Sequence, residues 1–228
     1  MDNYFSLVFQ EILTCFRFIY NLLLMKRKLL SIAALLCFIT GAKAQTSYGF
    51  KAGATFPKMT ASLGSVSVST ESSTSFYLTG YLDAPLANNF SIQPGLSLQG
   101  KGGKGLTLID FEELGNNVKL DLMYLELPVN FVYSIPTGNS GNVFLGAGPY
   151  AGLGLSAKAK AENVKIDVGF GDNKLKRFDA GINFLAGYRL SNGFLINGGY
   201  GLGLVDMAGG EGGSLKNRVF SIGIGYQL

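Results

Sequence analysis

The stretch Met123-Tyr-Leu-Glu-Leu-Pro-Val-Asn-Phe-Val-Tyr133 alternates apolar residues with other residues along its length. Successive side chains of a β-strand point to opposite faces, so one face would carry an unbroken apolar row. That row consists of Leu125, Leu127, Val129, Phe131 and Tyr133. The opposite face includes the carboxylate of Glu126. Either the apolar row packs in a protein core while Glu126 meets water, or the row meets lipid while Glu126 points into a polar lumen.

Seven further segments show the same period of two, which predicts strands. They are 48–56, 76–84, 90–101, 143–155, 178–189, 194–204 and 220–228. The links between the eight segments alternate in length. Short links with turn-forming residues are 85–89, 134–142 and 191–193, and long links are 57–74, 102–119, 156–176 and 205–217. Short turns at one end and long loops at the other are typical of an up-and-down outer-membrane barrel.

The face opposite the apolar rows is rich in glycine and small polar residues, and this composition decides between the two orientations. A soluble barrel that carries an apolar ligand, such as a lipocalin, would place the apolar rows inside. Glycines facing water would weaken the strands, whereas a narrow eight-stranded lumen favours small residues. We therefore expect an all-β fold, an eight-stranded antiparallel up-and-down transmembrane β-barrel of OmpA- or OmpX-like size, with its apolar rows facing lipid.

Two details of this barrel follow from the sequence. Open sheet edges do not occur in hydrocarbon, so the first and eighth strands should pair. Pro94, Pro128 and Pro149 fall inside expected strands, where proline is found at edges or bulges, and we interpret them as local bulges.

Aromatic residues of the apolar rows gather at two levels, as expected where rings sit at the two membrane interfaces. Near the short turns they are Tyr48, Phe90, Tyr133, Tyr188, Phe194 and Tyr226. Near the long loops they are Phe56, Phe76, Phe178 and Phe220. We expect these ten side chains to form two lipid-interface girdles.

A secretory signal peptide is predicted at 25–44, where a basic stretch (Met25-Lys-Arg-Lys28) precedes an apolar one and the sequence Ala42-Lys-Ala44. A lipid anchor at Cys37 is disfavoured, because lipoprotein processing requires a small residue before the cysteine and this sequence has Leu36 there. Residues 1–24 are interpreted as an upstream extension from a misplaced start, with a second signal or spanning segment as the alternative. The barrel domain is then 45–228, in the cell outer membrane.

The residue inventory excludes several kinds of function. The chain has no histidine, and both cysteines precede Gln45, so His-dependent hydrolysis, thiol chemistry and His or Cys metal sites are excluded. Five of the 19 basic and two of the 15 acidic residues also precede Gln45, which leaves 14 and 13. No basic patch indicates nucleic acid. Glu112-Glu113 is interpreted as a solvated loop. We expect no enzyme, cofactor or metal.

Four ionisable residues, Lys51, Asp83, Glu126 and Arg189, fall on the faces expected to line the lumen. Buried charges are costly unless paired, so we hypothesise a luminal charge network in which Glu126 turns toward Lys51. Such a network would either neutralise a filled lumen or gate small solutes or protons.

Several motifs resemble one known family across residues 45–228. They are Gly49-Phe-Lys-Ala-Gly-Ala54, Phe90-Ser-Ile-Gln-Pro-Gly95, Tyr124-Leu-Glu-Leu-Pro128, Gly146-Ala-Gly-Pro-Tyr150 and Gly223-Ile-Gly-Tyr226. In these motifs the chain resembles the PorT-type outer-membrane β-barrel family of Bacteroidota. Barrels of this kind usually finish on an aromatic residue, whereas this sequence finishes Tyr226-Gln-Leu228. PorT is associated with type IX secretion and gliding, and most members of the family have no assigned role.

The resemblance implies an integral outer-membrane barrel with an interaction, assembly or secretion-associated role, presenting long extracellular loops. Its expected partners are outer-membrane lipid, the barrel assembly machinery, and secretion-system or surface proteins. The alternatives are a narrow gated channel or transporter for small solutes and, third, a soluble periplasmic ligand-binding barrel.

Overall fold

A computed structural model of the chain describes residues 46–63, 66–105, 118–161, 164–171, 175–208 and 214–228. The expected signal peptide, the segment before it and Glu112-Glu113 lie outside these residues. Ten strands and one 3-10 turn, Gly138–Ser140, are described. The strands are β1 Ser47–Leu63, β2 Val66–Ser69, β3 Ser75–Ala87, β4 Phe90–Lys104, β5 Lys119–Pro136, β6 Gly141–Ala161, β7 Val164–Asp167, β8 Phe178–Leu190, β9 Phe194–Gly203 and β10 Ser214–Gln227. The described residues include no helix long and apolar enough to span a membrane.

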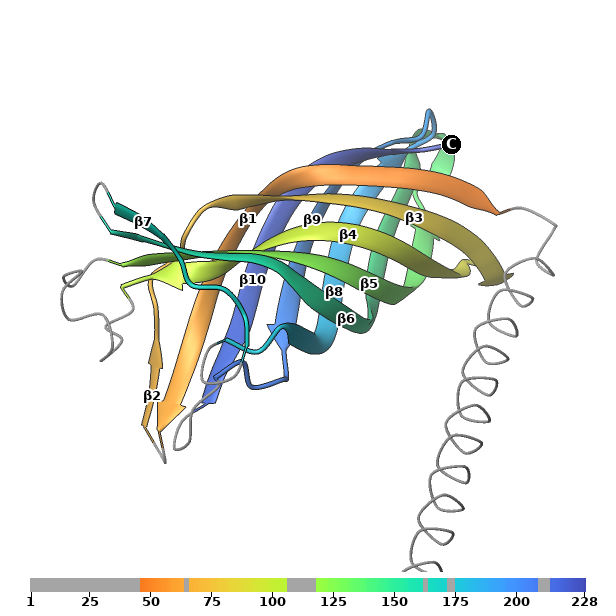
Figure 1. The fold of residues 1–228 in the computed structure, drawn as a ribbon. Helices are drawn as coiled ribbons and strands as arrows, with labels where there is room; N and C mark the ends of the chain where they lie inside the picture. Colours follow the sequence, from red (N-terminus) through yellow and green to blue (C-terminus); the bar gives the residue numbers. More distant parts are fainter. Residues whose placement is uncertain (1–45, 64–65, 106–117, 162–163, 172–174, 209–213) are drawn as a thin grey trace, which may run out of the picture. The chain divides into compact units, whose positions relative to one another are not determined.

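Eight of the strands form a closed antiparallel barrel, as the sequence predicted (Figure 1). They follow the order β1-β3-β4-β5-β6-β8-β9-β10, and β10 pairs with β1 from Gly49 opposite Gln227 to Ser62 opposite Ser214. The remaining two strands are short additions, since β2 pairs with β1 and β7 with β6. The predicted closure between the first and eighth barrel strands is confirmed.

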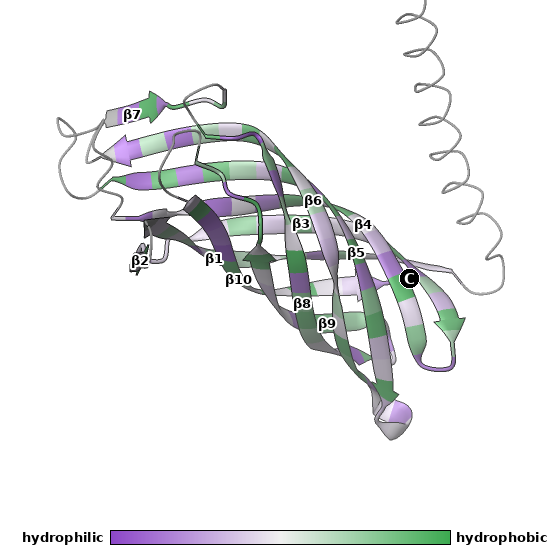
Figure 2. Ribbon diagram, turned by 90° about the horizontal axis from the view of Figure 1, so that it is seen from below, coloured by the Kyte–Doolittle hydropathy of each residue, from purple (hydrophilic) through white to green (hydrophobic). Residues whose placement is uncertain are grey.

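Hydrophobic and hydrophilic residues alternate along the barrel strands (Figure 2). The apolar residues point outward, since Leu127 is 60% exposed and Ile224 is 54% exposed. Glu126, the polar residue next to Leu127, points inward and is 3% exposed. A belt of exposed apolar side chains would be unfavourable in water and is stable in hydrocarbon. The orientation with apolar rows toward lipid is therefore confirmed.

The strands near the long loops are longer than the sequence predicted. Parts of the expected loops 57–74, 102–119, 156–176 and 205–217 are β-structure, because β1, β4, β5, β6 and β10 extend into them and β2 and β7 lie within them. The apolar residues change sides there. On β5, Leu120 and Leu122 are buried inside, while Lys119 and Asp121 point outward. Outside the lipid the outer face meets water, so the usual rule of a buried apolar face returns.

The expectation of bulges at the three strand prolines is wrong. The β4–β5 register is the same on both sides of Pro94 and Pro128, although pairing is interrupted between them. Pro149 pairs with Ile182 in unbroken register. The described register shifts lie elsewhere, between Pro85 and Ala87 of β3 and at Leu155 of β6, which has no partner in β5. Each proline lacks a backbone N–H and so donates no hydrogen bond to the neighbouring strand, but it does not insert the extra residue that defines a bulge.

Candidate functional site

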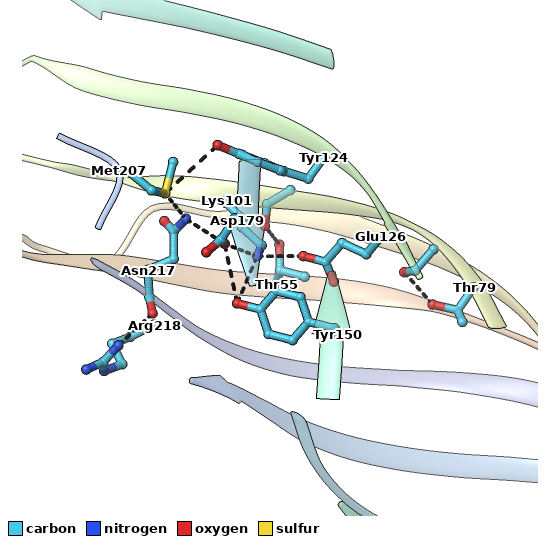
Figure 3. Close-up of polar contacts among 12 residues, drawn as sticks. Thr55, Thr79, Lys101, Tyr124, Glu126, Tyr150, Asp179, Met207, Asn217 and Arg218 are labelled. Carbon is cyan, nitrogen blue, oxygen red and sulfur yellow. Dashed lines mark hydrogen bonds and ion pairs between the residues drawn. The ribbon is translucent and has the colours of Figure 1, made fainter. Parts of the chain in front are cut away.

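Three ionisable side chains meet in the middle of the lumen (Figure 3). Lys101 of β4 places its Nζ 2.5 Å from Glu126 Oε1 on β5 and 2.6 Å from Asp179 Oδ2 on β8. All three side chains are buried, with exposures of 2%, 4% and 0%. Lys101 also donates to Tyr150 Oη at 3.2 Å and lies 4.3 Å from the centre of that ring. We call these four residues the central cluster.

Strand register explains why two carboxylates converge on one ammonium group. Glu126 pairs with Gly152 of β6, and Gly152 pairs with Asp179 of β8, so the three positions form one row across the sheet. Because Gly152 has no side chain, the space between the two acids stays open. A Cβ atom there would lie 3.3 Å from Glu126 Cγ, which is tighter than ordinary contact. Lys101, on the neighbouring strand β4, places its ammonium group between the two acids.

The central cluster is covered on its long-loop side. Asn217 of β10 donates to Asp179 Oδ2 at 3.2 Å, and Met207, which follows β9, is fully buried against Asn217 and Tyr124. An apolar cluster packs around this cover. Its buried members are Met59, Leu120, Leu122, Tyr124, Ala157, Met207 and Leu215. With one ammonium and two carboxylates, the central cluster is capped on this side and carries one excess negative charge when all three groups are ionised.

A second group of polar residues lies nearer the short turns. Asp83 accepts from Gln93 at 3.2 Å and from Gln227 at 2.7 Å, and its Oδ2 is 3.4 Å from Arg189 Nη1. Lys51 donates to Gln93 Oε1 at 3.5 Å and lies over the ring of Tyr81 at 4.3 Å. A small cavity is lined by residues that include Lys51, Gln93, Arg189 and Gln227. With two cationic groups and one carboxylate, this group has an excess positive charge.

The hypothesised network of Lys51, Asp83, Glu126 and Arg189 is thus divided between the two groups. Asp83 and Arg189 lie together near the short turns. The predicted contact of Glu126 with Lys51 is wrong, since Glu126 pairs with Lys101 instead. Lys101 and Asp179 both fall on polar faces of their expected strands. Only the register of β4, β5, β6 and β8 shows that they meet.

Met207 and Asn217 could not be assigned to the lumen from the sequence. Both lie in the stretch expected to be a long loop, where no alternating pattern had been identified. Asn217 is an inward residue of β10. Met207 donates its backbone N–H to Leu215 O at 2.8 Å, and this bond holds Met207 beside β10, with its side chain buried in the lumen.

Most of the aromatic residues proposed for the interface girdles point outward. Eight are more than a third exposed: Tyr48, Phe76, Phe90, Tyr133, Phe178, Phe194, Phe220 and Tyr226. The other two, Phe56 and Tyr188, are partly covered by neighbours. Phe56 lies 6.2 Å from Phe220 between ring centres, and the Tyr188 hydroxyl bonds Thr137 at 2.9 Å.

Comparison with known proteins adds a family and several similar folds. The family model described as "Outer membrane protein beta-barrel domain" matches residues 43–209. No curated protein matches the sequence significantly. Similar solved structures include the attachment invasion locus protein Ail of Yersinia pestis, with 13% identity, 81% of this chain and 99% of that chain covered, and a TM-score of 0.42. Neisserial surface protein A has 13% identity, 81% and 98% coverage and a TM-score of 0.46. The outer membrane protease OmpT from Escherichia coli has 10% identity, 81% and 97% coverage and a TM-score of 0.40.

Proposed function

Because the chain belongs to the outer membrane protein β-barrel family and resides in the outer membrane, we propose that it is a non-enzymatic barrel that acts through interaction or assembly at its long-loop end. The observation that carries this proposal is the extension of β-structure beyond the lipid-facing belt. There β7 adds to β6 and β2 adds to β1, and no described strand pairs with the outer edge of either. Unpaired strand edges are surfaces to which a partner chain can add.

Cross-linking in native outer membranes tests this role. A photo-reactive residue placed at Ile166 of β7, which is 37% exposed, should yield a discrete cross-linked protein. The same residue at Leu127, in the middle of the lipid-facing row of β5, is the matched control and should yield none. If Ile166 and Leu127 give the same products, or if Ile166 gives none, the interaction role is wrong.

The finer proposal, suggested by the resemblance to PorT-type barrels, is that the partner belongs to a secretion system. Identification of the cross-linked protein by mass spectrometry decides this point. A secretion-system component would support it, whereas a barrel assembly or unrelated surface protein would contradict it.

The absence of catalysis is also part of the proposal, and it is supported by the lack of histidine anywhere in the chain. The described residues contain no group of three metal-ligating acids, cysteines or histidines. The folded barrel should release no product from casein or from phospholipid micelles above the level of a heat-unfolded sample. Turnover that disappears on heating would contradict a non-enzymatic role.

A gated channel is the second candidate, and the cavity beside Lys51 and Arg189 favours it. The two candidates differ in planar bilayers. An interaction barrel with the capped central cluster should be electrically silent, and Glu126→Gln should remain silent. Discrete openings in the natural protein that change in size or frequency with Glu126→Gln would identify a channel and overturn the proposed interaction role.

A further inference from the structure

Four lysines lie side by side in one row across four strands at the long-loop end. Lys104 of β4 pairs with Lys119 of β5, Lys119 pairs with Lys160 of β6, and Lys160 pairs with Lys165 of β7. We call these four residues the lysine row. Directly paired residues share a face, and this face is the outer one, since the residues adjacent to Lys119 and Lys160, such as Leu120 and Ala159, are buried inside. The strand ends beside β7 include hydrophilic residues (Figure 2).

Like charges placed directly opposite each other destabilise a sheet, so the lysine row needs a compensating anion. Asp121 supplies part of it, at 2.8 Å from Lys119 and 2.6 Å from Lys160. Within the described residues, no carboxylate lies at ion-pairing distance from Lys104 or Lys165. The other acids paired into this face are Glu71, opposite Lys104, and Asp167, opposite the additional lysine Lys158.

The position of the lysine row relative to the lipid indicates which anion is available. On β6, Leu155 is 52% exposed and belongs to the lipid-facing belt, and the outward Lys158 and Lys160 follow it. The row's member Lys160 follows Leu155 by five residues, which is about 16 Å along the strand at about 3.3 Å per residue and about 12 Å along the membrane normal for a strand tilted by about 40°. The headgroup layer on each side of the hydrocarbon core is about 5–8 Å deep, and the flexible four-carbon stem of a lysine covers the remaining distance. The ammonium groups of the lysine row can therefore reach the lipid headgroups from the water side.

The same polarity occurs on the far side of the barrel. Two residues beyond the paired girdle aromatics Phe56 and Phe220, the outward positions are Lys58 and Arg218, which pair with each other. At the short-turn end, the outward positions of the described strands carry Tyr133, Ile135 and Leu190 and similar residues, and no lysine or arginine. Arg189 at that end turns inward to Asp83. Among the described strands, outward positive charge is thus confined to one membrane face.

We propose that the lysine row binds the phosphate groups of anionic lipid headgroups in the leaflet at the long-loop end. Lysine ammonium groups are strong donors to phosphate oxygens, and a row of four spaced at the strand separation of about 4.8 Å can contact phosphates from one or two lipids. The lipid source is favoured over a soluble anion because the row lies on the outward face of the same strands that carry the lipid-facing belt, within reach of the headgroups. This inference concerns a lipid site and does not depend on the proposed protein partner.

Lipid retention by the full chain tests the proposal. The barrel is placed in nanodiscs with equal amounts of phosphatidylglycerol and phosphatidylcholine, and the lipids that remain bound are counted by native mass spectrometry. The natural protein should retain phosphatidylglycerol in preference. Replacing the four lysines of the row by glutamine should reduce that preference by roughly tenfold or more. Replacing the same four by arginine, which preserves the charges, should maintain it.

A double variant serves as a control in case the fourfold variant does not fold. Lys104→Gln with Lys165→Gln removes two charges without touching either ion pair of Asp121, and it should lose part of the preference. Equal retention of both lipids by the natural protein, or an unchanged preference in the glutamine variants, would overturn the proposal. So would an arginine variant that loses as much as the glutamine variant. Binding of dextran sulfate that depends on the row, with lipid retention unchanged, would assign the row to a soluble polyanion instead.

Discussion

Lys101 and Lys51 point into the same lumen, yet their surroundings differ. Lys101 lies between two carboxylates, those of Glu126 and Asp179. Lys51 has a single weak donor contact, to Gln93 at 3.5 Å, and two aromatic rings. A buried charge is tolerated only where partners compensate for lost hydration. Lys101 is therefore the residue on which the filled lumen depends, and Lys51 is comparatively replaceable.

The first prediction compares methionine at these two positions. Lys101→Met leaves two buried carboxylates facing each other and should destabilise the barrel by about 3–5 kcal/mol. Lys51→Met removes a buried ammonium group that lacks a carboxylate contact, so the stability should change little. The measurement is the temperature at which the compact, fast-migrating band on gel electrophoresis is lost. Equal effects of the two substitutions would contradict the central cluster.

A rescue experiment separates charge from packing. Adding Glu126→Gln and Asp179→Asn to Lys101→Met removes the uncompensated charges and should restore part of the lost stability. If the triple variant is no more stable than Lys101→Met alone, the loss comes from packing around Lys101.

At this scale the sequence predicted which residues face the lumen better than which residues meet. Alternation within each strand placed Lys51, Asp83, Glu126 and Arg189 inside. It could not select Lys101 over Lys51 as the partner of Glu126, because strand tilt and register decide which inward residues share a level.

Asp206 provides a prediction about pH, outside the membrane-spanning part. Partial burial raises the pKa of its carboxyl, but backbone N–H groups of Leu215 and Ala208 and the nearby Lys176 and Lys216 together hold that pKa below its usual 3.8. A lowered folded pKa means that the carboxylate stabilises the fold above the unfolded pKa, and that this contribution is lost as pH falls through the folded value.

The long-loop end should therefore open to proteases as the pH is lowered below about 4. Pepsin cleavage near Met207, mapped by mass spectrometry, reports the opening. Asp206→Asn, which keeps an oxygen acceptor but cannot titrate, should show the same cleavage pattern throughout this range. A natural protein whose cleavage does not change with pH would contradict the role of Asp206.

At the scale of elements, a period of two was sufficient to identify all eight barrel strands because lipid imposes one rule along each crossing. It failed beyond the crossing. On β5 the outward residues change from Leu125 to Asp121 and Lys119, while Leu120 and Leu122 turn inward. A pattern search that expects apolar residues outside sees the extension as a polar loop. On β6, the unpaired Leu155 also shifts the phase of alternation, which no composition rule reveals.

Strand packing at the closure gives the third prediction. A Cβ atom at Gly223 of β10 would collide with Ala52 O of β1 and with the Tyr77 hydroxyl. Gly223→Ala should therefore push the two strands apart and cost about 1–3 kcal/mol. Gly80→Ala is the control, because no atom lies within 4 Å of a Cβ placed there. It should leave the melting temperature of the compact band almost unchanged. A harmless Gly223→Ala would contradict the described contact.

At the scale of the whole molecule, the exposed apolar belt defines the medium in which the barrel is stable. Leu127→Lys places a charge in the middle of the belt and should destabilise the bilayer-inserted barrel by about 2–4 kcal/mol. Denaturant titration in phosphatidylcholine vesicles, followed by the compact gel band, measures this change. Ile135→Lys, on the same outward face and close to the short turn of the strand, should cost far less. Equal costs at the two positions would contradict the membrane placement.

The pairing of β1 with β10 also determines the order in which the molecule can form. Residues 49 and 227, which are neighbours at this seam, lie 178 positions apart in the chain. Contacts of such long range are entropically costly and slow to form, because most of the intervening chain must be arranged first. Until β10 arrives, every intermediate presents two long unpaired strands, which is the condition that favours aggregation. Folding of this barrel is thus expected to be limited by a single late event, the meeting of its two most distant strands.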